Sequence, residues 1–338
     1  MNKAIGILAQ AYYLPAATRT AAAIFQAERI PGTPLAAAVD FRKDLGIDRV
    51  HVAEGQEPSA LGLEAARRAL AQASLDPREL DLIVDYTSIP EDFVAPTWAA
   101  AGQIQAALGA ERALAVAVNT GGCASYHVAL KYAAARMEDD PQCRTALLFS
   151  GNKAPASNRT YYPITLTCDS GGAFILKRGE ERRTVRSVEV STLGELHDVW
   201  WVPGLGGRKP GEPASERLLH MHSDMERFNS GVIKINLFMF RKVMRAALKR
   251  AGLTMKDVNC YIYPSFSTWD QKSFCTGLGI DPAALYTDGL RGRGHLQEND
   301  MVANYQDAAD SGRIKQGDIV MVTTNGAGFT WGAAVVRH

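Results

Sequence analysis

The chain has 338 residues, of which 46% are hydrophobic, so it is long enough for two ordinary domains or one large duplicated domain. Its 37 lysines and arginines balance 36 aspartates and glutamates, which excludes a global charge that attracts nucleic acid or a membrane surface. The N-terminal stretch MNKAIGILAQAYYLP lacks the apolar core of a signal peptide, and no apolar run reaches the ~20 residues of a membrane span, which together predict a cytoplasmic protein.

The first strongly patterned segment is residues 69–88, which predict the end of a helix, a short turn and a buried strand. The segment reads ALAQASLDPRELDLIVDYTS, and residues 247–266 repeat its pattern as ALKRAGLTMKDVNCYIYPSF. Apolar residues match at one constant offset, and Asp76 and Thr254 are the expected caps of the two turns. The two segments are therefore predicted to be copies of one α/β unit.

Two later pairs of segments extend the duplication in the same order. Residues 147–154 match 319–328, and residues 171–176 match 332–336. Three repeats in order predict an α/β protein with an N-terminal half, 1–178, and a C-terminal half, 179–338. Short apolar strands that alternate with helices predict mainly parallel sheets covered on both faces, with functional residues at strand ends where the halves meet.

Between the two copies of the repeat lies the candidate nucleophile. A strand-like stretch at residues 113–118 leads through Gly121 and Gly122 to Cys123, where a helical pattern begins. A helix N-terminus can lower a cysteine pKa of ~8.5 by one or more units, although most lone cysteines are small buried apolar residues. The following residues already supply a packing face, which favours the nucleophile. The five cysteines are odd in number and lack a CxxC pair, so neither a disulfide framework nor a metal site is predicted.

The motifs taken together resemble the ketoacyl synthase III branch of the thiolase superfamily over nearly the whole chain. The C-terminal stretch SGRIKQGDIVMVTTNGAGFTWGAAVVR is the most specific part, and the cysteine segment and TCDSGGAFIL precede it in the family's order. The resemblance implies a thiolase-like five-layered αβαβα fold of two similar halves, usually in a homodimer. It also implies an acyl thioester on Cys123, donated by acyl-CoA or an acyl carrier protein, with no bound cofactor.

Glycines near the C-terminus are candidates for the oxyanion hole. The backbone N–H of Cys123, with another from the loop Gly326–Gly328, would stabilise the charge that develops on a thioester oxygen. The alternative is that Gly326 and Gly328 only form the turn before the last strand.

Two positions depart from the family where its condensing chemistry resides. Family members carry a histidine after the proline that closes the strand matched by YIYP, and an asparagine after a later glycine. Here these positions hold Ser265 and His295. In the family the pair stabilises the enolate formed when a malonyl thioester loses carbon dioxide. Its replacement argues against ordinary decarboxylative condensation and leaves acylation of Cys123 less affected.

His295 is the candidate base or proton donor, since a neutral imidazole can take the thiol proton at physiological pH. Asp300 and Glu298 are near enough in sequence to orient it, although a histidine that caps a helix is the alternative. His197 is a second candidate for a pair with Cys123. The remaining histidines considered are expected in the core or at the surface, namely His127, His220 and His222.

Contacts to the rest of the substrate form a second set of candidates. By resemblance Lys234 meets acyl carrier protein, and Arg241, Arg245 and Lys249 follow at helical spacing, although such a stripe is more commonly a solvated helix face. The usual clamp on coenzyme A is missing, and Arg42, Lys43 or Arg159 are possible substitutes. Residues 89–98 are expected to line the acyl tunnel, with Glu91 as an auxiliary base or a rim residue.

We therefore expect an acyltransferase of ketoacyl synthase III type in specialised polyketide or fatty-acyl metabolism. The acceptor is either a carbon nucleophile, as in condensation, or an oxygen, nitrogen or sulfur nucleophile. The rival interpretation is a non-catalytic subunit that supports an active paralogue in a heterodimer. A thiolase proper or a hydroxymethylglutaryl synthase relative is a third interpretation, which the C-terminal motif disfavours.

Overall fold

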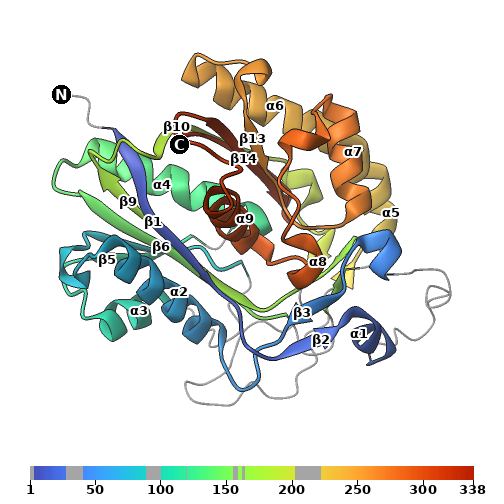
Figure 1. Cartoon of the computed structure of the whole chain (residues 1–338), viewed down its shortest axis with the longest axis horizontal. Helices are drawn as coiled ribbons and strands as arrows, with labels where there is room; N and C mark the ends of the chain where they lie inside the picture. Colours follow the sequence, from blue (N-terminus) through green and yellow to red (C-terminus); the bar gives the residue numbers. More distant parts are fainter. Residues whose placement is uncertain are drawn as a thin grey trace.

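The structure is a computed structural model in which two similar α/β halves lie side by side (Figure 1). It describes residues 4–27, 41–88, 100–118, 120–154, 159–161, 164–201 and 222–338. Within this part of the chain, no helix is long and apolar enough to cross a membrane.

Each half contributes its own set of strands to a nine-stranded sheet. The N-terminal set, from the junction outward, is β1 (Ile5–Tyr13), β9 (Ser170–Arg178), β6 (Thr145–Asn152), β4 (Leu82–Asp85) and β5 (Leu114–Ala117). The C-terminal set, from the junction outward, is β10 (Thr184–Thr192), β15 (Thr330–Arg337), β14 (Ile319–Gly326) and β13 (Cys260–Ile262). The two sets meet where β1 pairs with β10 at a single register position, Gly6 with Thr184.

The helices form three layers around the two sets of strands (Figure 1). Helices α4 and α9 contact strands of both halves and form the central layer. Helices α2 and α3 cover the outer face of the N-terminal strands, and α6 covers the outer face of the C-terminal strands with α7 packed on it. With two layers of strands this arrangement confirms the predicted αβαβα fold. The bounds are α2 (Pro58–Ala73), α3 (Ala100–Leu108), α4 (Ser125–Asp139), α6 (Lys234–Ala251), α7 (Thr268–Leu278) and α9 (Asp300–Asp310).

Shorter elements complete the described part of the chain. Near the N-terminus these are α1 (Ala21–Ala27), β2 (Thr18–Thr20) and β3 (Arg49–His51), and further along they are β7 (Thr160–Tyr161), β8 (Thr165–Leu166), β11 (Trp200–Trp201), β12 (His222–Ser223), α5 (Met225–Arg227) and α8 (Leu290–Arg293).

The predicted duplication is present in the structure. In the first copy α2 ends at a left-handed Ser74 and the side chain of Asp76 accepts the N–H of Arg78 before β4 begins. In the second copy α6 ends at a left-handed Gly252 and Thr254 forms a capping box before β13. The same cap-and-turn chemistry therefore precedes the same buried strand in both halves.

The expectation of mainly parallel sheets is wrong. Strand β4 pairs in parallel with β5 and β6, and β13 pairs in parallel with β14, but every pairing made by β1, β9, β10 or β15 is antiparallel. The reason is local, since β14 and β15 are joined by a tight turn at residues 327–329 that reverses the chain. The turn between β9 and β10 follows Arg178, and we propose the boundary between the halves there, at residues 178 and 179.

Candidate active site

Cys123 lies at the start of the central layer, in the single 3₁₀ turn η4 (Gly122–Ala124) that continues into α4. Gly121 and Gly122 precede it with φ of 95° and 53°, in the left-handed region that favours glycine. A Cβ added to Gly326 would lie 2.4 Å from the backbone nitrogen of Cys123. The turn after β14 can therefore pack directly on the backbone of Cys123 only because residue 326 has no side chain.

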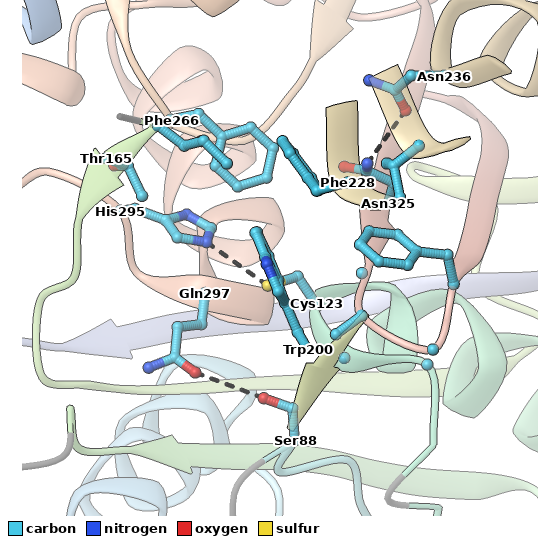
Figure 2. Close-up of a pocket in the computed structure, with 18 of the residues that line it drawn as sticks. Ser88, Cys123, Thr165, Trp200, Phe228, Asn236, Phe266, His295, Gln297 and Asn325 are labelled. Carbon is cyan, nitrogen blue, oxygen red and sulfur yellow. Dashed lines mark hydrogen bonds between the residues drawn. The ribbon is translucent and has the colours of Figure 1, made fainter. Parts of the chain in front are cut away.

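A histidine and an aspartate complete a chain of contacts that begins at this sulfur, and Figure 2 shows its first contact, between Cys123 and His295. The Sγ of Cys123 is 3.5 Å from Nε2 of His295, and Nδ1 of His295 is 2.5 Å from Oδ2 of Asp300. Asp300 is fully buried and also accepts the backbone N–H groups of Ser265 and Leu296. An aspartate held this way favours the tautomer with the proton on Nδ1, which leaves the lone pair of Nε2 facing the thiol.

The protonation state of the thiol differs from the expectation. Burial raises the pKa of Cys123 well above its usual range, and the carboxylates of Glu298 and Asp300 raise it further. The backbone N–H of Cys123 lowers the pKa, but by less. The helix N-terminus therefore does not by itself produce a thiolate, and removal of the thiol proton requires a base.

Glu298 is a fully buried carboxyl group beside the catalytic segment. It accepts the backbone N–H and the hydroxyl of Ser88 at 2.7 and 2.8 Å and the hydroxyl of Ser150 at 2.8 Å. Burial raises the pKa of Glu298, and these hydrogen bonds oppose the shift. Of the two acids near His295 in sequence, Asp300 contacts the imidazole, whereas Glu298 bonds to the two serines.

A cavity of about 320 Å³ opens beside Cys123 and His295. One wall is aromatic, since the ring of Trp200 stacks on Phe228 with centroids 5.1 Å apart and lies 5.7 Å from Phe329. The side chains of Ile233 and Trp269 line the cavity but are 44% and 62% exposed, so they mark its mouth. The glycines at 326 and 328 also line it, next to the thiol.

Ser265 does not face this cavity, although the sequence placed it among the auxiliary candidates. It is buried, and its hydroxyl accepts a hydrogen bond from Nδ2 of Asn304 at 3.2 Å. Its backbone N–H donates to Oδ2 of Asp300 at 2.7 Å. The side chain of Ser265 is absent from the cavity lining, so its contribution to the site is through the backbone.

The other histidines lie away from the thiol. His197 lines the rim of the cavity with a side chain 75% exposed, and its Nδ1 bonds to the carbonyl of Gly194. The sulfur of Cys123 contacts Nε2 of His295, and the expected pairing of His197 with Cys123 stays a prediction. His127 is in the core, where its Nε2 bonds to the carbonyl of Val322. His222 is in β12, and His220 lies outside the described residues.

The structure gives different outcomes for Glu91, for Arg159 and for the basic stripe on α6, which were expected to contact the substrate. Glu91 lies outside the described residues. Arg159 is buried in a two-bond ion pair with Asp169, so it is not available to clamp coenzyme A. The stripe on α6 is exposed along its length, with Arg241 also bonded to the carbonyl of Gly277. The stripe comprises Lys234, Arg241, Arg245 and Lys249.

Several polar residues of the cavity were not predicted from the sequence, among them Gln297, Asp270 and Asn325. Gln297 has a positive φ of 57°, a conformation rare for residues with a side chain, and it lies 3% exposed on the cavity wall. Asp270 lines the cavity, and burial raises its pKa to about 6. Asn325 precedes Gly326 in the same wall. No sequence motif marks these side chains, because their neighbours in space come from distant segments. Among the described residues no cluster of side chains suits a metal ion.

Comparison with known proteins places this geometry in a family. Residues 248–338 match the model of the 3-oxoacyl-[acyl-carrier-protein] synthase III C terminal. The β-ketoacyl-[acyl-carrier-protein] synthase III of Desulfitobacterium hafniense strain Y51 is 30% identical over 297 residues, covering 86% of this chain and 87% of the relative. The enzyme of the same description from Symbiobacterium thermophilum is 27% identical over 303 residues, covering 88% of each.

Solved structures share the fold at lower identity. The 3-oxoacyl-[acyl-carrier-protein] synthase III of Aquifex aeolicus VF5 superposes with a TM-score of 0.80 at 20% identity, over 99% of this chain and 100% of that one. The acyltransferase ChlB3 superposes with a TM-score of 0.82 at 23% identity, over 99% and 97%. The fold is therefore that of these two solved structures. The chain belongs to the β-ketoacyl-[acyl-carrier-protein] synthase III family.

Proposed function

We propose that this enzyme transfers an acyl group from a thioester donor, through an acyl-Cys123 intermediate, to an oxygen, nitrogen or sulfur nucleophile in cytoplasmic polyketide or fatty-acyl biosynthesis. The observation that carries the proposal is the continuous contact from Cys123 through His295 to Asp300, at 3.5 and 2.5 Å. Cysteine, base and orienting acid in this order are the groups that acyl transfer needs.

In the first half-reaction Nε2 of His295 takes the thiol proton as sulfur attacks the thioester carbonyl. The N–H of Cys123 and an N–H of the Gly326–Gly328 loop stabilise the oxyanion, each such donor contributing ~3 kcal/mol. The carbon–sulfur bond of the donor breaks, and His295 gives the proton to the departing thiolate, which leaves as the thiol. The raised pKa of Cys123 makes this base essential.

In the second half-reaction the acceptor approaches acyl-Cys123. His295 takes the proton of its hydroxyl, amine or thiol as the nucleophile attacks the acyl carbon. The bond to Cys123 breaks, and the imidazolium returns the proton to the sulfur. Asp300 stabilises the imidazolium in both halves without itself becoming protonated.

Decarboxylative condensation is less well supported by the same site. An enolate needs paired donors at one oxygen, and the second position holds Ser265, whose hydroxyl is buried against Asn304. A scaffold role beside an active paralogue is also less well supported. Such a subunit needs neither a thiol in contact with an imidazole nor a carboxylate behind that imidazole.

The donor is proposed to be an acyl carrier protein that docks along α6. Ile233 at the cavity mouth is followed at once by Lys234, so the start of the basic stripe adjoins the entrance. At 1.5 Å per residue, Lys249 is about 22 Å further along the helix. We expect Arg241→Glu with Arg245→Glu to raise the KM for a carrier-bound donor several-fold and to leave a free thioester nearly unchanged. An equal effect on both donors would eliminate this docking surface.

A homodimer is proposed to form through the outer edge of β5. This strand is at the edge of the nine-stranded sheet, and its Leu114 is 51% exposed. Edge strands of this kind pair with a second chain unless they are protected. Light scattering should give the mass of a dimer, and Leu114→Glu should shift it toward the monomer. A purified complex with a different chain would support the heterodimer instead.

The central test is intact-protein mass spectrometry after incubation with acyl-CoA, malonyl-CoA and acyl-carrier thioesters. The proposal predicts a mass increase that equals the acyl group, is absent in Cys123→Ala and disappears when a suitable alcohol, amine or thiol is added. No adduct with any donor would contradict the proposal and favour the scaffold role.

A further inference from the structure

The cavity beside the thiol of Cys123 also contains two asparagines in a mainly apolar and aromatic setting. Asn236 and Asn325 both line the cavity, near Phe228 and Phe329. Asn325 is 9% exposed, and among the described residues its Oδ1 has no hydrogen-bond partner. A buried amide oxygen without a partner costs ~1–3 kcal/mol, so its presence requires an explanation.

The orientation of this amide follows from its neighbours. The indole N–H of the fully buried Trp331 is a donor only, and it lies 2.8 Å from Oδ1 of Asn236. This contact fixes which end of Asn236 is the oxygen. The same oxygen is 3.1 Å from the amide of Asn325, which must therefore present Nδ2 to it. The oxygen of Asn325 is consequently an acceptor on the side away from Asn236, as Figure 2 shows.

The position of Asn325 restricts which chemical groups can contact its Oδ1. Asn325 directly precedes Gly326, which packs against the backbone of Cys123. A group in contact with Oδ1 therefore lies in the cavity that Cys123 and Gly326 also line. Such a group must carry an N–H or O–H, because a carbonyl or ether oxygen would repel the acceptor.

We propose that Oδ1 of Asn325 accepts a hydrogen bond from an N–H or O–H of the thioester substrate close to its sulfur, and that it makes the enzyme selective for such donors. The proposal rests on the acyl transfer proposed above. Two parts of a substrate carry this chemistry, namely the amide of the pantetheine arm nearest the sulfur and a hydroxyl or amine near the carbonyl of the acyl group. Trp331 and Asn236 are positioning residues in this account.

The test compares matched thioesters on the wild type and on Asn325→Leu, by the rate of acylation of Cys123 in intact-protein mass spectrometry. In the first arm, an acyl N-acetylcysteamine thioester is compared with the analogue in which the amide N–H is replaced by oxygen. In the second arm, a hydroxyacyl thioester is compared with its deoxy counterpart on the same cysteamine. Asn229→Leu, an exposed asparagine that does not line the cavity, is the matched control.

We expect the wild type and Asn229→Leu to prefer the N–H or O–H substrate ~10-fold in one arm, and Asn325→Leu to lose that preference. The arm that shows it identifies the source of the donor group. No preference in either arm, or a preference that survives in Asn325→Leu, would overturn the inference. If Cys123 accepts no thioester at all in the wild type, the proposed function itself fails. Alkylation of Cys123 and the melting temperature report whether the variant is folded.

Discussion

Two segments of the C-terminal half approach the same carboxylate and use it differently. Ser265 donates its backbone N–H to Asp300 and turns its hydroxyl to Asn304 inside the protein. His295 donates from Nδ1 to the same oxygen of Asp300 and presents Nε2 to the thiol of Cys123. One segment therefore supports the acid, and in the proposed mechanism the other moves the proton. A site with one imidazole is suited to proton transfer. It is not suited to stabilising an enolate, which needs two hydrogen-bond donors at one oxygen.

The largest expected effect is from removal of the imidazole. His295→Ala should slow acylation of Cys123 by ~10²–10⁴-fold, because the thiol, whose pKa is raised, then has no base. His197→Ala, on the exposed rim, is the matched control and should change the rate little. Stopped-flow release of the donor thiol measures both rates. A larger loss in the His197 variant would reverse the assignment of the base.

Removal of the charge behind the imidazole should have the next largest effect. Asp300→Asn should lower the acylation rate ~10²-fold or more, since an amide neither fixes the Nδ1–H tautomer nor stabilises the imidazolium. The variant also disturbs the N–H contacts of Ser265 and Leu296, so its melting temperature should be measured in parallel. An acylation rate like that of the wild type would show that His295 works without the acid.

Removal of the negative charge of Glu298 should increase the reactivity of the Cys123 thiol, whereas the two preceding variants should decrease the rate of acylation. Because the charge of Glu298 raises the pKa of Cys123, Glu298→Gln should lower that pKa and increase the fraction of thiolate at a given pH. The rate of alkylation by iodoacetamide should rise several-fold, and its pH profile should shift to lower pH. Glu226→Gln, at an exposed position, is the control. A profile unchanged from the wild type would mean that Glu298 is not ionised in the range tested.

The smallest effect is expected at Ser265. Ser265→Ala removes one hydrogen bond to Asn304, which keeps its bond to the carbonyl of Tyr263 at 2.9 Å. We expect a loss of ~1 kcal/mol in the free energy of unfolding and a rate of acyl transfer within about threefold of the wild type. Denaturant unfolding and steady-state kinetics measure the two quantities. A much larger loss of activity would give the hydroxyl a direct catalytic role and erase the contrast with His295.

Much of this protein was predictable from local sequence. The duplicated unit is encoded by apolar spacing and by caps such as Asp76 and Thr254, which act within a few residues of themselves. The glycines before Cys123 likewise specify a left-handed turn wherever the chain runs. The fold followed from such short-range patterns and from the family resemblance they support, and so did the contact between Cys123 and His295 on which the proposed mechanism depends.

Only the tertiary structure decided which side chains contact each other and how the pKa of Cys123 is shifted. The sequence left Asp300 and Glu298 equal as partners of His295, and only packing brings Asp300 to 2.5 Å and buries Glu298 against Ser88. It predicted a lowered thiol pKa from the helix N-terminus, whereas burial beside two carboxylates raises it. The free oxygen of Asn325 follows from Trp331 and Asn236, which β15 and α6 bring together. Electrostatic and hydrogen-bond energies depend on separation and solvent exposure, which a linear pattern does not contain.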